Sequence, residues 1–88
     1  MYFVYTLHSK KDGNLYIGYT ENLQRRFVEH QEGKVMSTKH RLPIELIYYE
    51  AYLNQDDAKG REKFLKSGSG HRFLKKQLVH HFSSRSQQ

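Results

Sequence analysis

The chain has 88 residues, no cysteine and a formal net charge of +6 at pH 7. A chain of this length supports one modest hydrophobic core, so we expect a single domain. The lack of cysteine excludes disulfides and thiolate zinc sites, and no apolar run is long enough to span a membrane. The N-terminal segment is too short for a signal peptide, so we expect a cytoplasmic location.

The basic charge and the seven tyrosines are typical of a protein with a polyanionic partner. Lys and Arg release counterions from phosphates, and aromatic rings pack on sugars or bases. A basic surface that only keeps the protein in solution explains the charge equally well. Composition alone therefore leaves both alternatives open.

The first half of the chain is predicted to form a β-hairpin followed by a helix. Tyr2–His8 and Leu15–Tyr19 are rich in aromatic and β-branched residues, which favour strands, and an Asp-Gly turn lies between them. A helix is expected over Asn22–Glu32, with Thr20 or Asn22 as its N-cap. Its inward face consists of residues at four-residue spacing, namely Leu23, Phe27 and Gln31.

The second half is predicted to contain one more strand and two helices. Ile44–Tyr52 is apolar nearly throughout, which predicts a strand in the interior of a sheet. A helix is expected over residues 54–66, and the glycine-rich residues 68–70 separate it from a last helix over His71–Phe82. Residues 83–88 contain no apolar side chain and are expected to be disordered.

The expected fold is a compact α/β (α+β) domain over residues 1–82, with a small three-stranded, mostly antiparallel sheet flanked by helices. The hairpin register decides whether Tyr5 and Tyr16 can act together. A two-residue Asp-Gly turn would pair Ser9 with Tyr16 and leave Tyr5 about 13 Å away along the strand. A four-residue loop over residues 9–12 would place Tyr5 directly opposite Tyr16, on one face.

Two polar side chains of the first predicted helix share a face. Arg26 and His30 are four residues apart, so they lie one helical turn from each other. Because Leu23 and Phe27 face the core, the face with Arg26 and His30 lies at the flank of the core and can look toward the hairpin.

At these residues the chain resembles the GIY-YIG nucleases. Tyr16-Ile17-Gly18 matches the second signature tripeptide of that family. Phe3-Val4-Tyr5 keeps the tyrosine of the first tripeptide and lacks its leading glycine. Asn22–Arg26 is similar to the arginine helix of the family, with Arg26 at the position of the family's arginine and His30 one turn later.

The resemblance continues into the second half of the chain. Ala58–Lys63 resembles the segment that carries the family's metal-binding glutamate, which assigns that role to Glu62. Leu65–Gly68 and Phe73–Lys76 are similar to the small stand-alone branch of the family, which is related to the N-terminal nuclease module of the excinuclease in nucleotide-excision repair of DNA. The resemblance covers roughly residues 1–78.

The resemblance implies a metal-dependent endonuclease that hydrolyses phosphodiester bonds in DNA. Tyr5 and Tyr16 would handle the attacking water, and Arg26 would hold the phosphate. His30 would position water or support a tyrosine. Glu62 would bind one divalent metal ion, Mg²⁺ or in its place Mn²⁺, together with water and substrate phosphate.

Each of these residues also has a structural interpretation. Tyrosines in strands are commonly sheet aromatics, and a histidine at a helix end is commonly structural. Glu62 can form an ion pair with Lys66 or Arg26. For the whole chain, the alternatives to a nuclease are a catalytically inactive nucleic-acid-binding module on the same scaffold and a basic protein-interaction domain.

The expected partner is DNA, including structured or branched DNA, with a targeting protein as a further partner. Seven basic residues could follow its phosphates, namely Lys34, Lys39, His40, Arg41, Arg72, Lys75 and Lys76. An ordinary solvated surface is the alternative for each of them. The sequence leaves open whether the target is DNA or RNA, and whether the chain forms oligomers.

Overall fold

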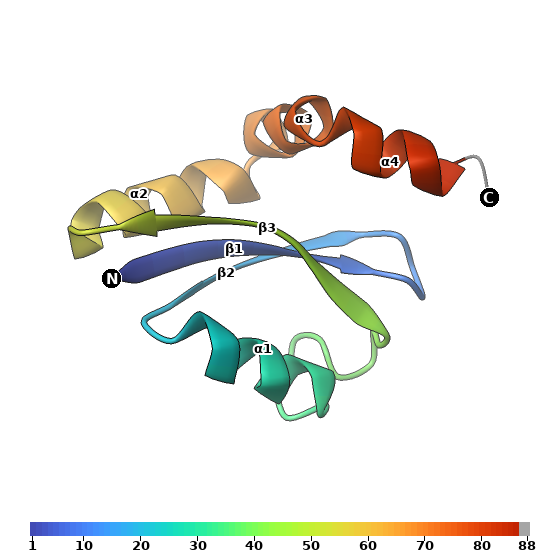
Figure 1. Cartoon of the computed structure of the whole chain (residues 1–88), viewed down its shortest axis with the longest axis horizontal. Helices are drawn as coiled ribbons and strands as arrows, with labels where there is room; N and C mark the ends of the chain where they lie inside the picture. The colour runs from blue at the N-terminus through green and yellow to red at the C-terminus, as the bar shows by residue number, and fades with distance from the viewer. Residues whose placement is uncertain (87–88) are drawn as a thin grey trace.

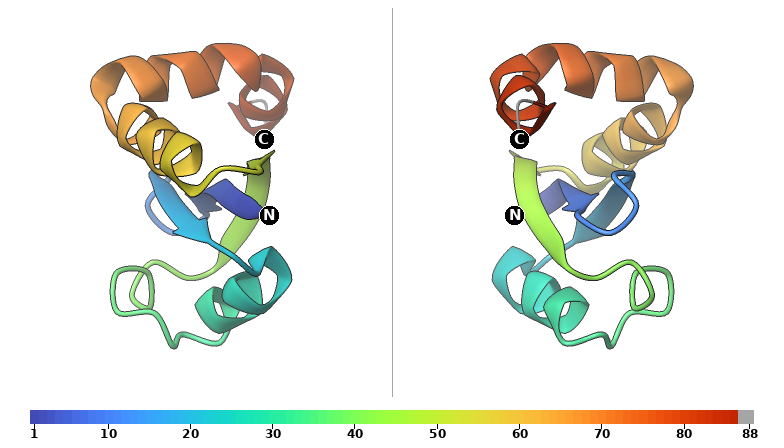
Figure 2. Two further views of the ribbon diagram at one scale, coloured as in Figure 1. Left: turned by 90° about the vertical axis from the view of Figure 1, so that its left-hand side faces the viewer. Right: turned by 90° about the vertical axis from the view of Figure 1, so that its right-hand side faces the viewer.

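A computed structural model of the chain describes residues 1–86, which form three strands and four helices. A three-stranded antiparallel sheet has the order β2-β1-β3. The helix α1 covers one face of this sheet, and α2, α3 and α4 lie on the other (Figures 1 and 2). The elements are β1 (Tyr2–Ser9), β2 (Leu15–Thr20), α1 (Leu23–Gln31), β3 (Ile44–Tyr52), α2 (Gln55–Lys66), α3 (Gly68–Gln77) and α4 (Val79–Ser86).

This architecture confirms the predicted α+β fold with a small antiparallel sheet. Of the two predicted caps of α1, Thr20 and Asn22, Asn22 caps the helix: its side chain accepts a hydrogen bond from the Arg25 N–H at 3.1 Å. Within residues 1–86, no helix is long and apolar enough to cross a membrane.

Two clusters of apolar side chains fill the spaces on either side of the sheet. On the α1 side, Tyr5, Leu7 and Ile44 form the buried cluster, against which Leu23 and Phe27 of the helix pack. On the opposite side, β1 and β2 meet α2 and α3. The buried members of that second cluster are Val4, Ile17, Ala58, Leu65 and Leu74.

The prediction that Ile44–Tyr52 lies in the interior of the sheet is wrong, because β1 is the central strand and β3 is at an edge. Helices cover both faces of the sheet, so even an edge strand buries alternate residues on each side. Ile44 packs on the α1 side, whereas Tyr48 and Tyr52 pack on the side of α2 and α3. The continuous apolar run therefore reflects cover on both faces.

The hairpin register differs from both alternatives considered for the sequence. Tyr5 pairs with Gly18, and Tyr16 pairs with Leu7. The prediction that Tyr5 lies directly opposite Tyr16 is therefore wrong. The two tyrosines are diagonal neighbours on one face, with ring centroids 6.4 Å apart, so the requirement for a shared face is met.

The loop itself explains the register. The Ser9 N–H donates to the Asn14 carbonyl at 3.0 Å, and the Ser9 hydroxyl accepts from the N–H groups of Lys11 and Asp12. Gly13 has a φ of 75°, a conformation that favours glycine. These contacts close the loop around Lys10–Gly13, one residue later than the predicted four-residue loop over residues 9–12.

The C-terminal helices also differ from the prediction of one helix over His71–Phe82. Residues 68–70 form the first turn of α3 rather than a break, and the Ser67 hydroxyl caps that turn by accepting from the Gly70 N–H at 3.1 Å. A Cβ atom on Gly70 would collide with the backbone at Leu65, so glycine permits the close approach of α3 to α2.

The chain turns again at Leu78, between α3 and α4. The helix α4 continues to Ser86, into the segment for which the sequence predicted disorder. The expected disorder of residues 87 and 88 lies outside the described residues.

Candidate active site

Tyr5 lies at the centre of β1 and its side chain is only 1% exposed. Its ring passes over Gly18 of β2. A Cβ atom at Gly18 would overlap the hydroxyl oxygen of Tyr5 and the ring carbon that carries it. The glycine of the Tyr16-Ile17-Gly18 tripeptide therefore provides the space for the tyrosine of the neighbouring strand. The two tripeptides are one packing unit.

His30 holds the hydroxyl of that tyrosine from the last turn of α1. It is completely buried, with its Nε2 atom 2.8 Å from the Tyr5 hydroxyl and its Nδ1 atom 2.7 Å from the Thr38 hydroxyl. Burial, together with the nearby positive charge of Arg26, lowers the pKa of His30 to about 4. The imidazole is therefore neutral at pH 7.

The direction of the hydrogen bonds follows from the protonation state of Tyr5. Burial raises the pKa of the Tyr5 hydroxyl to about 12, against the lowering effect of a hydrogen bond from Arg26. Because the Tyr5 hydroxyl is protonated at pH 7 and its hydrogen-bond partner is Nε2 of His30, the Tyr5 O–H donates to Nε2. The network then assigns the ring proton to Nδ1, which donates to Thr38.

Tyr16 completes a cluster of three rings. Its ring lies 5.2 Å from that of His30 and 6.4 Å from that of Tyr5, and it is only partly buried. Tyr16 is thus the more accessible of the two tyrosines. Tyr5 is enclosed and already hydrogen-bonded.

Arg26 lies at the edge of this cluster, with a side chain that is 38% exposed. One guanidinium nitrogen donates to the Glu29 carboxylate at 3.1 Å, and the guanidinium lies close enough to the Tyr5 hydroxyl to lower its pKa against the effect of burial. Arg25, its neighbour, is exposed. The helix therefore directs Arg26, not Arg25, toward the tyrosines.

Glu62 comes from α2, in the helical layer on the other face of the sheet. Its side chain is 21% exposed and forms an ion pair with Lys66 at 3.1 Å, one of the alternatives considered for the sequence. Its neighbours on the helix face, Ala58 and Leu65, are completely buried as expected. The charge of Glu62 is among the smaller causes that raise the pKa of Tyr5, which places the carboxylate within electrostatic reach of that hydroxyl.

The donor chemistry at Glu62 fits one Mg²⁺ ion. Mg²⁺ is commonly held by one or two carboxylates, and water and substrate phosphate complete its coordination. A partly exposed carboxylate leaves room for those waters. Lys66 would have to release the carboxylate when the ion binds.

Sequence reasoning missed two features that support the site: the contact of Thr38 with His30, and the ion pair of Glu50 with Arg61. Thr38, which fixes the ring of His30, lies in the irregular loop before β3 and carries no local signal. Glu50 of β3 accepts hydrogen bonds from two guanidinium nitrogens of Arg61, at 2.9 and 3.0 Å, and these bonds hold α2 against the sheet. Hydrogen bonds from Arg61 and two tyrosines outweigh the effect of burial and lower the pKa of Glu50.

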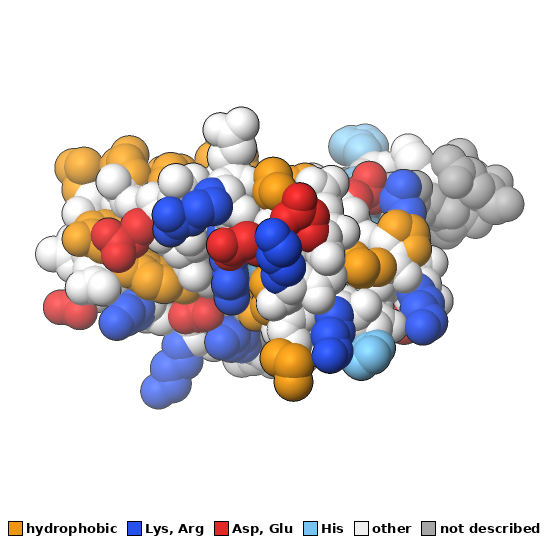
Figure 3. Space-filling model, turned by 90° about the horizontal axis from the view of Figure 1, so that it is seen from below, with side chains coloured by type: hydrophobic (Ala, Val, Ile, Leu, Met, Phe, Trp, Pro, Cys, Tyr) orange, Lys and Arg blue, Asp and Glu red, His pale blue; other side chains and the backbone are white. Residues whose placement is uncertain are grey.

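The structure brings two of the seven predicted phosphate-contacting residues together. Arg41 and Lys75 line a common hollow of about 350 Å³ beside the β1–β2 loop. Lys34 pairs with Glu32 at 3.0 Å. On the α1 side of the molecule, Lys and Arg side chains gather toward one long edge, with acids among them further in (Figure 3). The remaining four of the seven predicted residues are exposed, namely Lys39, His40, Arg72 and Lys76.

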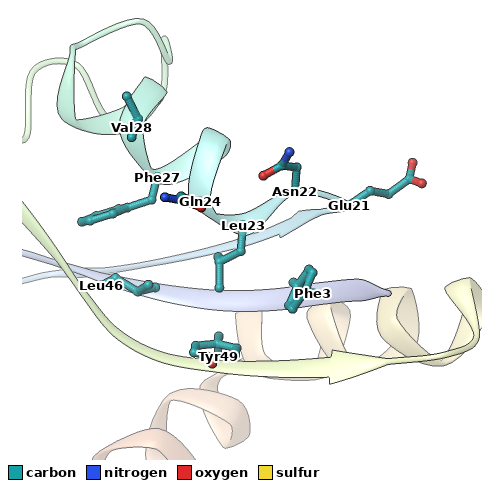
Figure 4. A pocket seen from close by; sticks show the side chains of 9 residues that line it. All are labelled: Phe3, Glu21, Asn22, Leu23, Gln24, Phe27, Val28, Leu46 and Tyr49. Carbon is teal, nitrogen blue, oxygen red and sulfur yellow. The ribbon is translucent and has the colours of Figure 1, made fainter.

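A separate apolar hollow of about 530 Å³ lies between α1 and the sheet (Figure 4). Phe3, Leu23 and Tyr49 line it together with six other residues. None of the five predicted catalytic residues is among them. The hollow is therefore distinct from the tyrosine cluster.

Comparison with known proteins shows the family of this chain. A family model described as the GIY-YIG catalytic domain matches residues 1–77. A UPF0213 protein of Pediococcus acidilactici is 42% identical over 67 residues, which are 73% of this chain and 68% of that protein. A UPF0213 protein of Staphylococcus epidermidis is 37% identical over 75 residues, 84% of this chain and 90% of the relative.

A UPF0213 protein of Streptococcus pneumoniae is 38% identical over 65 residues, 73% of this chain and 65% of the relative. No solved structure matches the chain. The names of these relatives state no activity.

Proposed function

From the premise that this chain belongs to the GIY-YIG catalytic domain family, we propose that it is a metal-dependent endonuclease that hydrolyses phosphodiester bonds in DNA. The observation that carries the proposal is the ring cluster of Tyr5, Tyr16 and His30, with Arg26 at its edge. Hydrolysis of a phosphodiester needs a positioned water, a base and positive charge at the phosphate. This cluster offers a candidate base and a positive charge in one place.

In the proposed reaction, Tyr16 first releases its phenolic proton to solvent, and the resulting phenolate accepts the proton of the attacking water. Tyr5 is a positioning residue. A base must reach its proton within about 3 Å or through one water. Tyr5 is enclosed and its proton is already committed to His30, whereas Tyr16 is partly exposed. Tyr5, with its high pKa, stays protonated and fixes the ring cluster.

Arg26 binds the phosphate at the site of hydrolysis. Its guanidinium can donate two parallel hydrogen bonds to phosphate oxygens and offset the charge that develops on them. Glu62 would hold one Mg²⁺ ion, for which Mn²⁺ could substitute, and the bound ion would stabilise charge on the phosphate and the leaving oxygen. Within the chain, Glu62 must exchange its contact with Lys66 for the ion.

The second candidate is a catalytically inactive nucleic-acid-binding module. The specific observation in its favour is the ion pair between Glu62 and Lys66, which occupies the only carboxylate assigned to the metal. The basic charge of the chain would then serve binding alone.

Cleavage assays with matched variants separate the two candidates. We expect Mg²⁺-dependent cleavage of branched, nicked or plain duplex DNA by the wild type. Arg26→Ala should reduce kcat/KM by about 10²-fold or more, because charge stabilisation at the phosphate is lost. Arg25→Ala, one residue away and exposed, should change kcat/KM by less than about threefold. Glu62→Gln should abolish cleavage and leave salt-dependent DNA binding nearly intact.

Binding without cleavage on all three substrates would support the binding module instead. Equal loss of activity in Arg25→Ala and Arg26→Ala would contradict the role of Arg26. We further propose that the enzyme selects DNA by shape, such as branches or nicks, or through a targeting protein, since shape and phosphate contacts carry little sequence information.

A further inference from the structure

Three side chains of types that bind metals meet on one face of the sheet, opposite the face that carries Tyr5 and Tyr16. His8 lies near the end of β1, Glu45 near the start of β3, and His81 in α4. His8 and Glu45 are direct partners in the β1–β3 register, so their side chains project from the same face. The helix α4 lies on that side of the sheet, toward the end at which β1 finishes (Figure 1).

The ligand atoms of these residues converge. Nδ1 of His8 is 3.0 Å from Nε2 of His81, which is 3.9 Å from a carboxylate oxygen of Glu45. All three atoms lie within 4.8 Å of one another. Bonds of 2.0–2.1 Å around a tetrahedral ion place neighbouring ligand atoms about 3.3 Å apart. The observed separations of 3.0 and 3.9 Å lie below and above this value. Small side-chain rotations would therefore bring the ligand atoms to the distances that a tetrahedral ion requires.

The lone pairs of the cluster are compatible with a cation. Only one proton fits between the facing nitrogens of His8 and His81, and the Glu45 carboxylate accepts but does not donate. A metal ion accepts lone pairs from all three groups at once. The Phe82 ring, 5.3 Å from that of His8, shields one side of the cluster.

We propose that His8, Glu45 and His81 bind one Zn²⁺ ion, which fastens α4 to the sheet. Two imidazoles and one carboxylate suit Zn²⁺, whereas Mg²⁺ prefers ligand sets made of oxygen alone. A hollow of about 280 Å³ beside His8 gives water access for the remaining coordination position.

This site is separate from the metal proposed for catalysis. His8 and Tyr5 are three residues apart on β1, so they project from opposite faces of the sheet. Glu62 lies on α2 and is not a member of the cluster. The two sites therefore differ in ligand atoms as well as in place, and can be tested independently.

Calorimetric titration of ZnCl₂ into the metal-free chain tests the proposal. We expect one Zn²⁺ per wild-type chain, and the same in Glu62→Gln. His81→Ala and Glu45→Gln should each weaken Zn²⁺ binding by at least about tenfold, because each removes a ligand. The matched control is His80→Ala, since His80 is the exposed neighbour of His81 and should change the affinity by less than about twofold.

Thermal unfolding gives a second readout. Zn²⁺ should raise the Tm of the wild type and of His80→Ala, because an ion that binds only the folded state stabilises it, and should not raise the Tm of His81→Ala. Mg²⁺ at the same concentration should have no such effect through this site. Circular dichroism shows whether each variant is folded, and Glu45→Gln replaces His81→Ala if the latter is not. Equal Zn²⁺ affinity of His80→Ala and His81→Ala would overturn the proposal, as would an unchanged wild-type Tm.

Discussion

His30 is the residue on which the geometry of the candidate site depends most directly. It is fully buried and its two ring nitrogens bind hydroxyls from two different segments, Tyr5 of β1 and Thr38 of the loop before β3. Protonation would leave a charge in a buried position beside Arg26. The neutral ring is therefore a requirement of the fold at this point, whether or not it also takes part in catalysis.

The pKa of His30 leads to a prediction about stability. It is about 4 in the folded chain, below the ordinary value of 6.5. Between these values the unfolded chain binds a proton that the folded chain does not, so the free energy of unfolding should fall as the pH falls from about 6.5 to 4. The difference between the two pKa values corresponds to at most roughly 3 kcal/mol.

Urea unfolding at pH 7.0, 6.0 and 5.0 measures this effect. The stability difference between the wild type and His30→Gln should shrink as the pH falls, since glutamine does not titrate. These pH values lie above the range in which most carboxylates titrate, so the titration of Asp and Glu contributes little to the difference. Parallel pH profiles for the two proteins would contradict the prediction.

At the scale of elements, the pairing of β1 with β2 builds the site through Gly18. The ring of Tyr5 occupies the space above this glycine. Gly18→Ala should displace the ring, break its bond to His30 and cost about 1–3 kcal/mol, as overpacking in a core does. Cleavage should be lost while DNA binding persists, because the basic surface is unchanged.

Gly60→Ala is the matched control for this prediction. A Cβ atom at Gly60 of α2 meets nothing within 4 Å. Because alanine favours a helix interior, this change should raise the free energy of unfolding by up to about 1 kcal/mol. Chemical denaturation of both variants gives the two values, and a Gly18→Ala protein as stable and active as the wild type would refute the packing argument.

The same pair of strands shows what the sequence could and could not predict. The bounds of the strands and the Asn22 cap depend on local residue preferences, which the sequence displays directly. The register depends on Ser9 and on the conformation of Gly13, and a shift of one loop position exchanges every partner. Thr38 could not be predicted because its contact with His30 is formed only when the loop folds back on α1.

At the scale of the whole molecule, the candidate site draws on both helical layers. Arg26 and His30 come from α1, whereas Glu62 comes from α2 on the other side of the sheet. The ion pair of Arg61 with Glu50 ties α2 to β3, and the Arg61 guanidinium also lies over the Phe73 ring of α3 at 4.7 Å. Sequence spacing gave no indication of this long-range network, which fixes the layer that carries Glu62.

The distribution of charge leads to a prediction about DNA binding. The chain carries a formal net charge of +6, and Arg41 and Lys75 line one hollow beside the hairpin loop. Arg41 is partly neutralised by Asp12 at 3.1 Å, whereas Lys75 is exposed. If the basic residues contact phosphates, the logarithm of the binding constant falls linearly with the logarithm of salt concentration, by about 0.9 per phosphate.

Lys75→Ala should therefore reduce the magnitude of that slope by about 1 and weaken binding to all DNA sequences alike. Lys63→Ala is the control, because Lys63 is an exposed lysine of α2 outside the predicted set of phosphate contacts. Fluorescence anisotropy with labelled duplex and branched DNA between about 50 and 200 mM salt measures both slopes. If DNA phosphates contact Lys75 at a defined place, the slope should change in Lys75→Ala only. If DNA binds a diffuse basic surface, the slope should change equally in Lys75→Ala and Lys63→Ala. An equal change would thus show that net charge, rather than the hollow at Arg41 and Lys75, governs binding.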